Sequence, residues 1–449
     1  MSKPTPEQAT QRGLNGVAIP QRQTRPDDAA PGYRTYEVYQ RERVGESTEK
    51  IKPMQLVSAD YAADPFPLMS ILRDNYPCYR DWVNNCYWVS GYNDVTSIFS
   101  DDANFTSRSK LWYYQQEAYG RDLSDQLAVQ VCRAEGMDQF ATPVAEQLVE
   151  QLQAQIQATG SADLARTFAA QYNPLLQARI LDLPDALVEP FANLHWQMQR
   201  GAKWQPQRTE AGWAATLAME ELLAPLLQTR QAGGGTDLIS VVAELGGSAA
   251  DLVTTVLEHD HATLHGGLAN LWHHLLTDDT APTAQILDEV RQDRRLLKVA
   301  YLETLRHAPP VVTAHRFARH EVERFGRLLP EGALLKVSAA GANRDPRVFA
   351  DPDVYQRQRR DICHREPRGQ YRADGLASGI AFGLGKPSIH PAVPEDRPRS
   401  LYALTRDTVI KASQVLLESL PNLQLTDTPR QHCLGLDELY ACWSLQIKA

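Results

Sequence analysis

The most informative segment of the chain is residues 342–359, which read ANRDPRVFADPDVYQRQR. About forty residues earlier, residues 303–306 read ETLR. The i, i+3 spacing of Glu303 and Arg306 places a carboxylate and a guanidinium on one face of a helix, where they can pair. Such a pair is common by itself. Its combination with the later segment, which ends at Arg359, is specific.

The residues outside this segment predict a mostly helical protein with small β-sheets. Residues 144–156 carry an apolar stripe with a four-residue period, and helices are expected at 212–229, 250–276, 284–307 and 400–420. Residues 311–337 alternate and contain a Pro-Glu-Gly turn, as small strands and hairpins do. Residues 1–55 are polar and show no sustained period, so we expect an N-terminal arm that orders against a partner, followed by one domain from residue 56 to residue 449.

The composition excludes several classes of protein. The chain has 449 residues, and 46 basic against 55 acidic side chains give a formal net charge of -9, which argues against nucleic acid as the main ligand. No apolar run is long enough for a membrane span or a secretory signal, so a cytoplasmic protein is expected. The six cysteines are scattered and form no CxxC pair, which indicates neither a zinc site nor a disulfide framework.

The ordered motifs resemble those of the cytochrome P450 superfamily, from about residue 56 to the C-terminus. By this resemblance Glu303, Arg306 and Arg359 form the structural lock behind the haem pocket, and Arg316 lies at a haem-propionate position. Residues 382–385 read FGLG and look like the start of the haem-binding loop, while residues 404–423 look like the last long helix. The fold that this resemblance implies is mainly α with small β-sheets, the cytochrome P450-like fold.

The same resemblance shows that the cysteine ligand of the haem iron is missing. Its position is Ile389, or Arg399 if the loop is aligned from its far end. A thiolate there would supply electron density for O–O cleavage. The residue expected to hold a propionate two positions earlier is Pro387. His390 follows the vacated cysteine position and is an alternative haem ligand, although an ordinary loop histidine is the simpler interpretation.

The central helix departs from the family pattern as well. Residues 258–265 read EHDHATLH and look like the segment over the distal face of the haem, with Thr263 at the oxygen-handling position. The acid that normally precedes this threonine is Ala262, and the small residue four positions before it is His259. His259 and Thr263 are therefore the candidate catalytic residues of a reaction other than the usual one.

A metal site is a further alternative on this helix. Glu258, His261 and His265 have i, i+3, i+7 spacing and could supply two histidines and a carboxylate to non-haem iron. They face about 150° away from the side of Thr263, and such triads seldom draw all three ligands from one helix, so polar contacts to a neighbouring helix are the simpler interpretation.

These observations predict a haem-free protein without cofactor, acting as a non-catalytic accessory or activating partner of another biosynthetic enzyme. Family members that have lost the cysteine act as activating subunits for glycosyltransferases or as recruiting domains in peptide assembly lines. The expected partner is accordingly a glycosyltransferase, an assembly-line enzyme or a true cytochrome P450. The alternatives are an enzyme that uses the pocket for non-standard chemistry with non-haem iron, and a haem protein with a histidine ligand.

Overall fold

The computed structural model describes residues 50–109, 119–199, 201, 209–257, 261–363, 377, 379–380, 399–434 and 439–449. The side chains of residues 257 and 261–263 are not part of this description. Most of the polar arm, both candidate catalytic side chains, and the loop with Ile389 and His390 therefore lie outside the described residues. The packed part of the chain begins at Ile51 and Pro53, which are buried.

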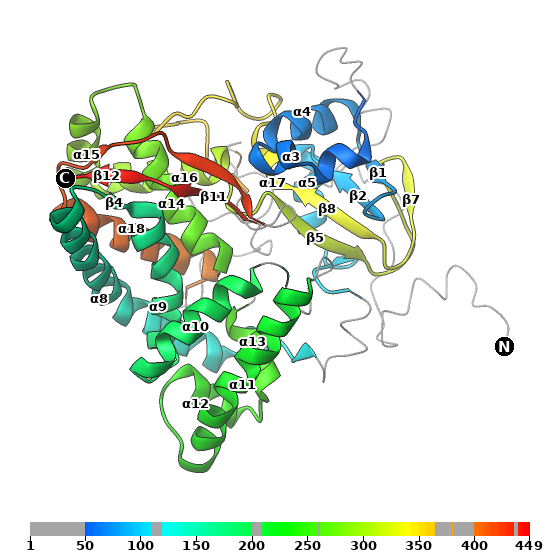
Figure 1. Ribbon diagram of the computed structural model, residues 1–449. Helices are drawn as coiled ribbons and strands as arrows, with labels where there is room; N and C mark the ends of the chain where they lie inside the picture. The colour runs from blue at the N-terminus through cyan, green and yellow to red at the C-terminus, as the bar shows by residue number, and fades with distance from the viewer. Residues whose placement is uncertain are drawn as a thin grey trace.

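A helical part makes up most of the molecule (Figure 1). It contains the long helix α8 (Leu127–Thr159) and the helices α9 (Ala170–Ile180), α10 (Asp185–Met198), α11 (Glu210–Gly233), α12 (Leu238–Glu244), α13 (Ala249–Leu257), α14 (His261–Thr277), α15 (Thr283–Gln292), α16 (Arg294–His307) and α18 (Leu401–Ser419). A short π-helical segment, η3 (Ala165–Ala169), leads into α9. α14 packs against α9, α16, α18 and strand β11 (Leu439–Ser444), so it lies in the centre of this part.

A five-stranded sheet forms the second part, with the order β1-β2-β8-β5-β3. Its strands are β1 (Tyr79–Asp81), β2 (Cys86–Val89), β3 (Phe105–Thr106), β5 (Thr313–Ala318) and β8 (Leu334–Ser338). β2 and β8 run parallel, and β5 pairs antiparallel with β8. The short helices α3 (Ala59–Ala63), α4 (Phe66–Asn75), α5 (Tyr92–Phe99) and α17 (Ala339–Asn343) and the 3-10 turn η2 (Pro53–Val57) lie beside this sheet (Figure 1).

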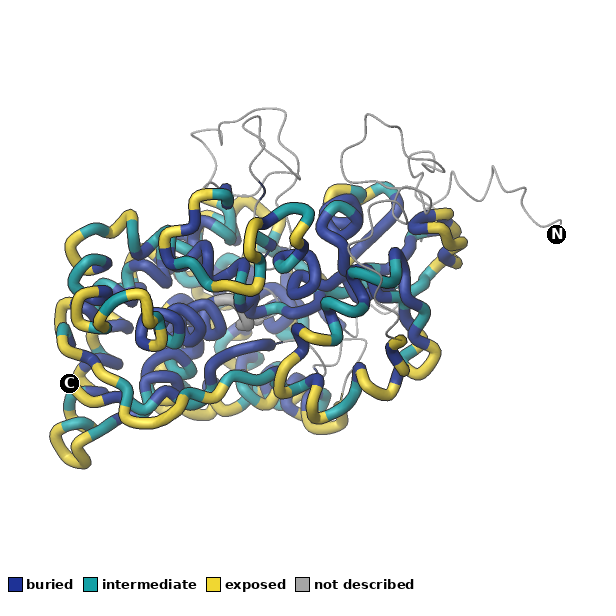
Figure 2. Tube along the Cα trace, turned by 90° about the horizontal axis from the view of Figure 1, so that it is seen from above, coloured by how far each residue is buried: buried dark blue, intermediate teal, exposed yellow. Residues whose placement is uncertain are grey.

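Three smaller sheets complete the β-structure of the described residues. β10 (Arg430–Leu434) pairs with β11, and β6 (Val322–Arg324) pairs with β7 (Arg327–Leu329). β12 (Gln446–Lys448) pairs with both β4 (Ala162–Asp163) and β9 (Gln424–Leu425). Buried backbone runs through the interior of both parts, while exposed residues lie on the outer loops and helix faces (Figure 2).

The sequence patterns explain most of these elements. Val144, Leu148 and Leu152 of the predicted stripe are fully buried on α8, and Ile156 is half-buried. The predicted helix at 284–307 is wrong in one respect: it is two helices, because the Asp293 carboxylate caps α16 by accepting a hydrogen bond from the Arg295 amide. The predicted helix at 250–276 corresponds to α13 and α14. In the described part of the chain, no helix combines the length and apolar character that a membrane span requires.

Candidate functional site

The Glu303 carboxylate is the centre of a fully buried ion cluster. It accepts hydrogen bonds from Arg306 Nε and Nη2, both at 2.7 Å, and from Arg359 Nε at 3.0 Å. The amide of Gln356 donates to it at 3.0 Å. All three charged side chains are 0% exposed. The structure thus brings together the three residues that the sequence predicts as a lock.

The lock is tied to the chain that leads toward the haem-binding loop. Arg306 Nη1 donates to the carbonyls of Asn343 and Pro352, both at 2.8 Å. The Asn343 side chain accepts from the Ile380 amide at 2.7 Å and donates to the Ile380 carbonyl at 2.6 Å. The Asn343 side chain therefore fixes the backbone at Ile380, two residues before Phe382.

Arg316 presents a partly buried positive charge on β5. Its guanidinium lies 4.7 Å from the centre of the Phe99 ring, and its Nη1 donates to the neighbouring carbonyl of His315 at 2.7 Å. Burial lowers the pKa of Arg316 to about 10, against a smaller opposing effect of Asp102. Among the described residues no carboxylate forms an ion pair with Arg316. A partly buried cation that forms no ion pair with a described carboxylate fits an anionic group such as a haem propionate.

Of the three candidate metal ligands, only the His265 side chain is among the described residues, and it is enclosed by other side chains. His265 is 1% exposed, and its ring centre lies 4.9 Å from that of Trp196 on α10 and 4.7 Å from that of Trp443 on β11. Neither ring nitrogen has a hydrogen-bond partner in the part of the chain that the structure describes. Burial lowers the pKa of His265 to about 3, so the imidazole is neutral at physiological pH.

His265 faces away from α16. One turn after Thr263, Gly267 lies so close to Tyr301 of α16 that an added Cβ would come within 3.0 Å of the Tyr301 hydroxyl. His265 instead contacts α10 and β11. The described residues contain no group of three potential metal ligands. Because Glu258 and the His261 side chain lie outside them, the metal site remains a prediction.

All six cysteines lie among the described residues and outside the haem-binding loop. Burial raises the pKa of Cys78 to about 12, of Cys132 to about 11 and of Cys442 to about 12, so these thiols stay protonated at neutral pH. Cys86 and Cys433 are buried in strands. Cys363 is buried beside the lock, where its amide donates to Ala377. No cysteine occurs between residues 364 and 432.

A cluster of three histidines on α14 and α16 was not predicted from the sequence. The His274 ring stacks on Tyr355 with centres 4.1 Å apart and an angle of 8° between the ring planes. His273 and His307 lie 5.1 and 5.0 Å from it. Burial, together with the charges of Arg344 and Arg306, lowers the pKa of His274 and of His307. The partners come from three segments, so helix periodicity alone could not reveal this cluster.

An ion pair across 130 residues anchors the segment before α8 to α13. Asp251 is buried and accepts hydrogen bonds from Arg121 Nε at 3.0 Å and Nη2 at 2.7 Å. The pKa of Asp251 is lowered in spite of desolvation, because hydrogen bonds from the side chain and backbone of Arg121 favour the carboxylate. Thr254 Oγ1 donates to the Tyr119 carbonyl at 2.7 Å, and the Leu123 amide donates to Thr255 Oγ1 at 3.0 Å.

We expect Asp251→Asn to loosen this anchor. The amide keeps the shape but loses the charge, which leaves the Arg121 guanidinium with weaker acceptors, and the free energy of unfolding should fall by about 1–3 kcal/mol. Hydrogen–deuterium exchange should rise selectively in residues 119–126 and 249–257. Unchanged exchange in both segments would contradict the assigned coupling. Asp185→Asn, at an exposed carboxylate, is the control.

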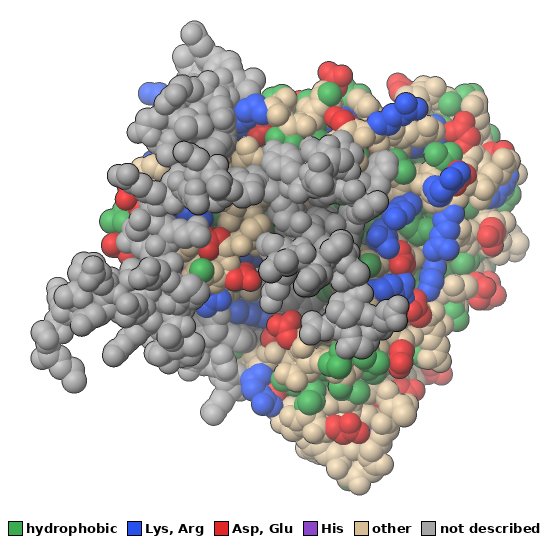
Figure 3. Space-filling model, turned by 180° about the vertical axis from the view of Figure 1, so that it is seen from behind, with side chains coloured by type: hydrophobic (Ala, Val, Ile, Leu, Met, Phe, Trp, Pro, Cys, Tyr) green, Lys and Arg blue, Asp and Glu red, His purple; other side chains and the backbone are tan. Residues whose placement is uncertain are grey.

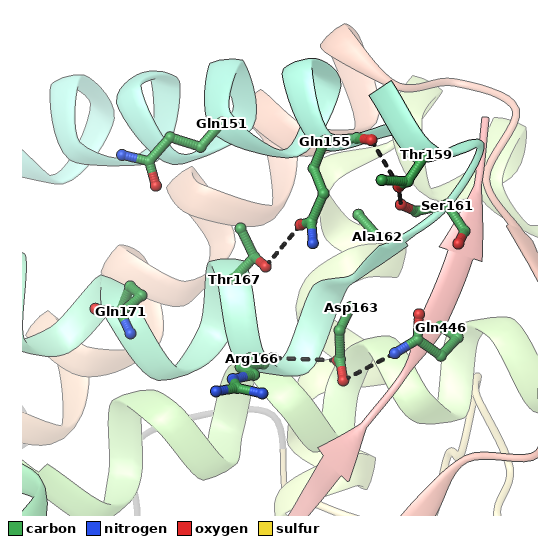
Figure 4. A pocket seen from close by; sticks show the side chains of 10 residues that line it. All are labelled: Gln151, Gln155, Thr159, Ser161, Ala162, Asp163, Arg166, Thr167, Gln171 and Gln446. Carbon is green, nitrogen blue, oxygen red and sulfur yellow. Dashed lines mark hydrogen bonds between the residues drawn. The ribbon is translucent and has the colours of Figure 1, made fainter. Parts of the chain in front are cut away.

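A polar hollow lies at the other end of α8, between its last turns, η3 and β12 (Figure 4). Its volume is about 520 Å³. The Asp163 carboxylate accepts hydrogen bonds from the Arg166 and Leu445 amides and from the Gln446 side chain. Thr167 Oγ1 donates to Gln155 at 3.0 Å. Arg166 is exposed on this surface, so it provides a control position for the charge reversals described below.

Comparisons with known proteins agree with this geometry. The family model for cytochrome P450 matches residues 278–361, which contain Glu303, Arg306 and Arg359. The chain belongs to the cytochrome P450 superfamily. Pulcherriminic acid synthase of Bacillus subtilis (strain 168) is 25% identical over 402 residues, which cover 85% of this chain and 94% of that protein.

Two solved structures illustrate the shared fold. The cytochrome P450 PksS of the Bacillus subtilis 168 bacillaene polyketide synthase superposes with a TM-score of 0.67 at 18% identity, covering 89% of this chain and 99% of that one. P450BioI, solved in complex with an acyl carrier protein ligated to hexadec-9Z-enoic acid, gives a TM-score of 0.66 at 20% identity, with 87% and 100% covered.

These findings correct the expectation that the chain binds no cofactor. The family match and the cytochrome P450 relatives point to haem, which family members hold in this fold. The described residues fit haem at one position, since Arg316 offers a partly buried positive charge, in no ion pair with a described carboxylate, for a propionate. The cysteine positions do not fit a thiolate ligand in the loop.

Proposed function

We propose that this chain is a haem-binding member of the superfamily that assists another biosynthetic enzyme and does not act as a haem–thiolate monooxygenase. The carrying observation is the placement of all six thiols outside the haem-binding loop, three of them with pKa values raised by burial. In a cytochrome P450, haem ligated by a cysteine thiolate supplies the oxidation chemistry. Without that ligand, the lock and Arg316 still serve binding and folding.

A basic surface supports a protein partner. It is formed by side chains of α16, of α18 and of Arg399, two residues before α18: Arg294, Arg295, Lys298, Arg399, Arg406 and Lys411. Partial burial lowers the pKa of Lys298, and the charges of Arg406 and Arg294 lower it further. Three carboxylates offset part of this charge: Asp138 pairs with Arg399 and Lys411, Asp407 with Arg399 and Arg406, and Asp293 with Arg295, whose side chain is 89% exposed. In a chain with a net charge of -9, this surface favours an acidic partner.

Lys and Arg side chains gather on the right of the back face, where these helices lie (Figure 3). The complex of P450BioI with an acyl carrier protein supports an assembly-line protein as one class of partner. A glycosyltransferase or a true cytochrome P450 remains a proposed partner on the strength of the family resemblance alone.

Turnover with and without this chain tests the proposal. The chain is co-expressed with the glycosyltransferase or assembly-line enzyme of its own pathway, and product formation by that enzyme is measured. We expect no turnover by the chain alone and a clear increase for the second enzyme in its presence. Oxygen-dependent turnover by the chain alone, with an electron-transfer partner, would contradict the accessory role.

Charge reversal tests whether the basic surface carries the association. Arg294→Glu with Arg295→Glu should weaken binding of the partner roughly tenfold or more at low salt, with a smaller effect at high salt. The matched control is Arg166→Glu, at an exposed arginine of the polar hollow. Equal loss in both variants would argue against the basic surface.

A second candidate function follows from the haem itself. An imidazole is a common haem ligand, and His390 directly follows the position that lacks cysteine. With His390 as ligand, the chain would be an oxidoreductase of non-standard type, with His259 and Thr263 near the substrate. His390→Ala should then abolish turnover and shift the haem spectrum, whereas an accessory protein should still activate its partner.

Arg316 gives a prediction on haem retention. Arg316→Ala should reduce the affinity for haem about tenfold or more, because a hydrogen bond to a charged group contributes about 1.5–3 kcal/mol. The unfolding midpoint of the haem-depleted protein should not fall, since the buried guanidinium has no carboxylate partner among the described residues. Haem titration and urea unfolding measure these effects. Arg316→Lys, which keeps the charge, should retain more haem than Arg316→Ala.

A further inference from the structure

Two neighbouring hollows form one groove along α8. Their volumes are about 530 and 380 Å³, and they share Gln139, Phe140 and Arg179. One wall is α8, and the other is formed by the end of α9 and by the end of α11 with the residues that follow it. We call this feature the α8 groove.

The α8 groove follows one face of the helix. Cys132, Gly136, Phe140, Pro143 and Gln147 lie in it at successive spacings of three or four residues. These fifteen residue steps correspond to a length of about 22 Å, since an α-helix rises about 1.5 Å per residue. The length equals about four helical turns, so the groove matches an elongated ligand.

Close packing of the two walls defines the floor of the α8 groove. A Cβ on Gly136 would lie 2.9 Å from Ile180 Cγ1, so only glycine permits this approach of α8 to the end of α9. Cys132 Sγ contacts the Thr236 carbonyl at 3.7 Å, which ties α8 to the residues after α11. The floor is therefore set by the fold rather than by mobile side chains.

The α8 groove has acidic side chains at one end and an arginine near its middle. At one end Glu135 is exposed, and the Asp182 side chain is 74% exposed. Arg230 is occupied, because it pairs with Asp182 at 3.0 Å and with Asp237 at 2.7 Å. Arg179 lies where the two hollows meet and is 45% exposed. Its nearest carboxylate is that of Asp185, 3.7 Å away and 94% exposed, so this pair is weak.

The other end of the α8 groove is apolar. Phe140 is half-buried, Pro143 is exposed and Val144 is buried, and all three line the smaller hollow. A ligand of complementary chemistry carries an apolar side chain here, a carboxylate one turn away at Arg179, and a cation beyond it near Glu135. Those features at i, i+3 and i+7 spacing describe an amphipathic helix.

We infer that the α8 groove binds an amphipathic helix of a protein partner, with an acidic side chain paired to Arg179 and an apolar side chain against Phe140. This inference rests on the proposed function in that it takes the ligand to be part of a partner protein. The α8 groove is distinct from the basic surface, so the partner is held at two places on the chain.

A library of displayed helical peptides tests this inference without any knowledge of the partner. Peptides are selected on the full-length chain, and the affinity of each is measured by fluorescence anisotropy. The selected peptides should share an acidic side chain three or four positions from an apolar one. Arg179→Glu should weaken their binding roughly tenfold or more, and replacing the acidic peptide residue by lysine should restore binding to this variant.

Two further variants distinguish peptide binding in the α8 groove from peptide binding elsewhere on the chain. Gln139→Trp fills the groove at an exposed position and should block the peptides, whereas Arg166→Glu should leave their binding unchanged. Peptides that bind wild type and Arg179→Glu equally, or that are insensitive to Gln139→Trp, would overturn the inference. Such a failure leaves the turnover assay with the partner enzyme unaffected, so the two proposals fail independently.

Discussion

Replacing Glu303 by glutamine is expected to lower the free energy of unfolding by about 3–5 kcal/mol, or to prevent folding. Two guanidinium groups converge on this carboxylate, and all three side chains are 0% exposed. The amide has no negative charge, so it leaves Arg306 without a carboxylate partner in the interior and leaves Arg359 with only Asp361, 3.1 Å away. Urea unfolding monitored by circular dichroism measures the loss, and recovery of folded protein from expression measures complete failure.

The matched control for this substitution is Glu150→Gln. Glu150 also lies on a helix, but it is exposed. The control should change the free energy of unfolding by less than about 0.5 kcal/mol. If both variants unfolded at the same urea concentration as wild type, the lock would not have the structural role assigned here.

Acidification from pH 7 to pH 5 is expected to destabilise the protein by about 5 kcal/mol through the cluster of His273, His274 and His307, because each imidazole that stays neutral in the folded chain contributes about 2 kcal/mol. Burial lowers the pKa of His273 to about 4 and of His307 to about 3, and it lowers that of His274. The unfolded chain binds protons below pH 6.5 while the folded cluster stays neutral. The contribution is therefore complete above pH 6.5 and is lost as the pH falls toward 4.

A variant of His274 tests the source of this pH dependence. His274→Phe keeps a ring that stacks on Tyr355 but removes one titrating group, so the loss on acidification should shrink by about 2 kcal/mol, the contribution of one imidazole. The measurement is the difference between the urea midpoints at pH 7 and pH 5 for both proteins. An identical difference in wild type and variant would show that His274 does not contribute.

The sequence predicted the parts of the fold that depend on short-range patterns. Glu303 and Arg306 are one helical turn apart, and the stripe on α8 follows the helical period. The division between α15 and α16 was readable in principle, because Asp293 is a good N-cap residue. It was overlooked because the apolar pattern continues on both sides of the division.

The remaining features depend on contacts between distant segments. His265 is enclosed by Trp196 and Trp443, and Asp251 pairs with Arg121. No local pattern brings these residues together. Gly267 lies against α16, whereas His265 contacts α10 and β11.

The prediction of a cofactor-free protein failed for a physical reason. It inferred the loss of haem from the missing cysteine, from Pro387 at a propionate position, and from Ala262 and His259 on the central helix. Haem binding also depends on burial of the macrocycle and on charges for its propionates, and Arg316 keeps such a charge in a buried position. The family relationship is stronger evidence about haem binding than the absence of individual residues.

The central claim is that the chain binds haem without a cysteine ligand. The most direct measurement is the absorbance spectrum of the protein purified from haem-replete cells, recorded after reduction and addition of carbon monoxide. We predict a Soret band whose position excludes thiolate ligation and which is unchanged when Cys363, the cysteine nearest in sequence to the loop, is replaced by serine. A thiolate-type Soret band, or no Soret band at stoichiometric haem supply, would contradict the account.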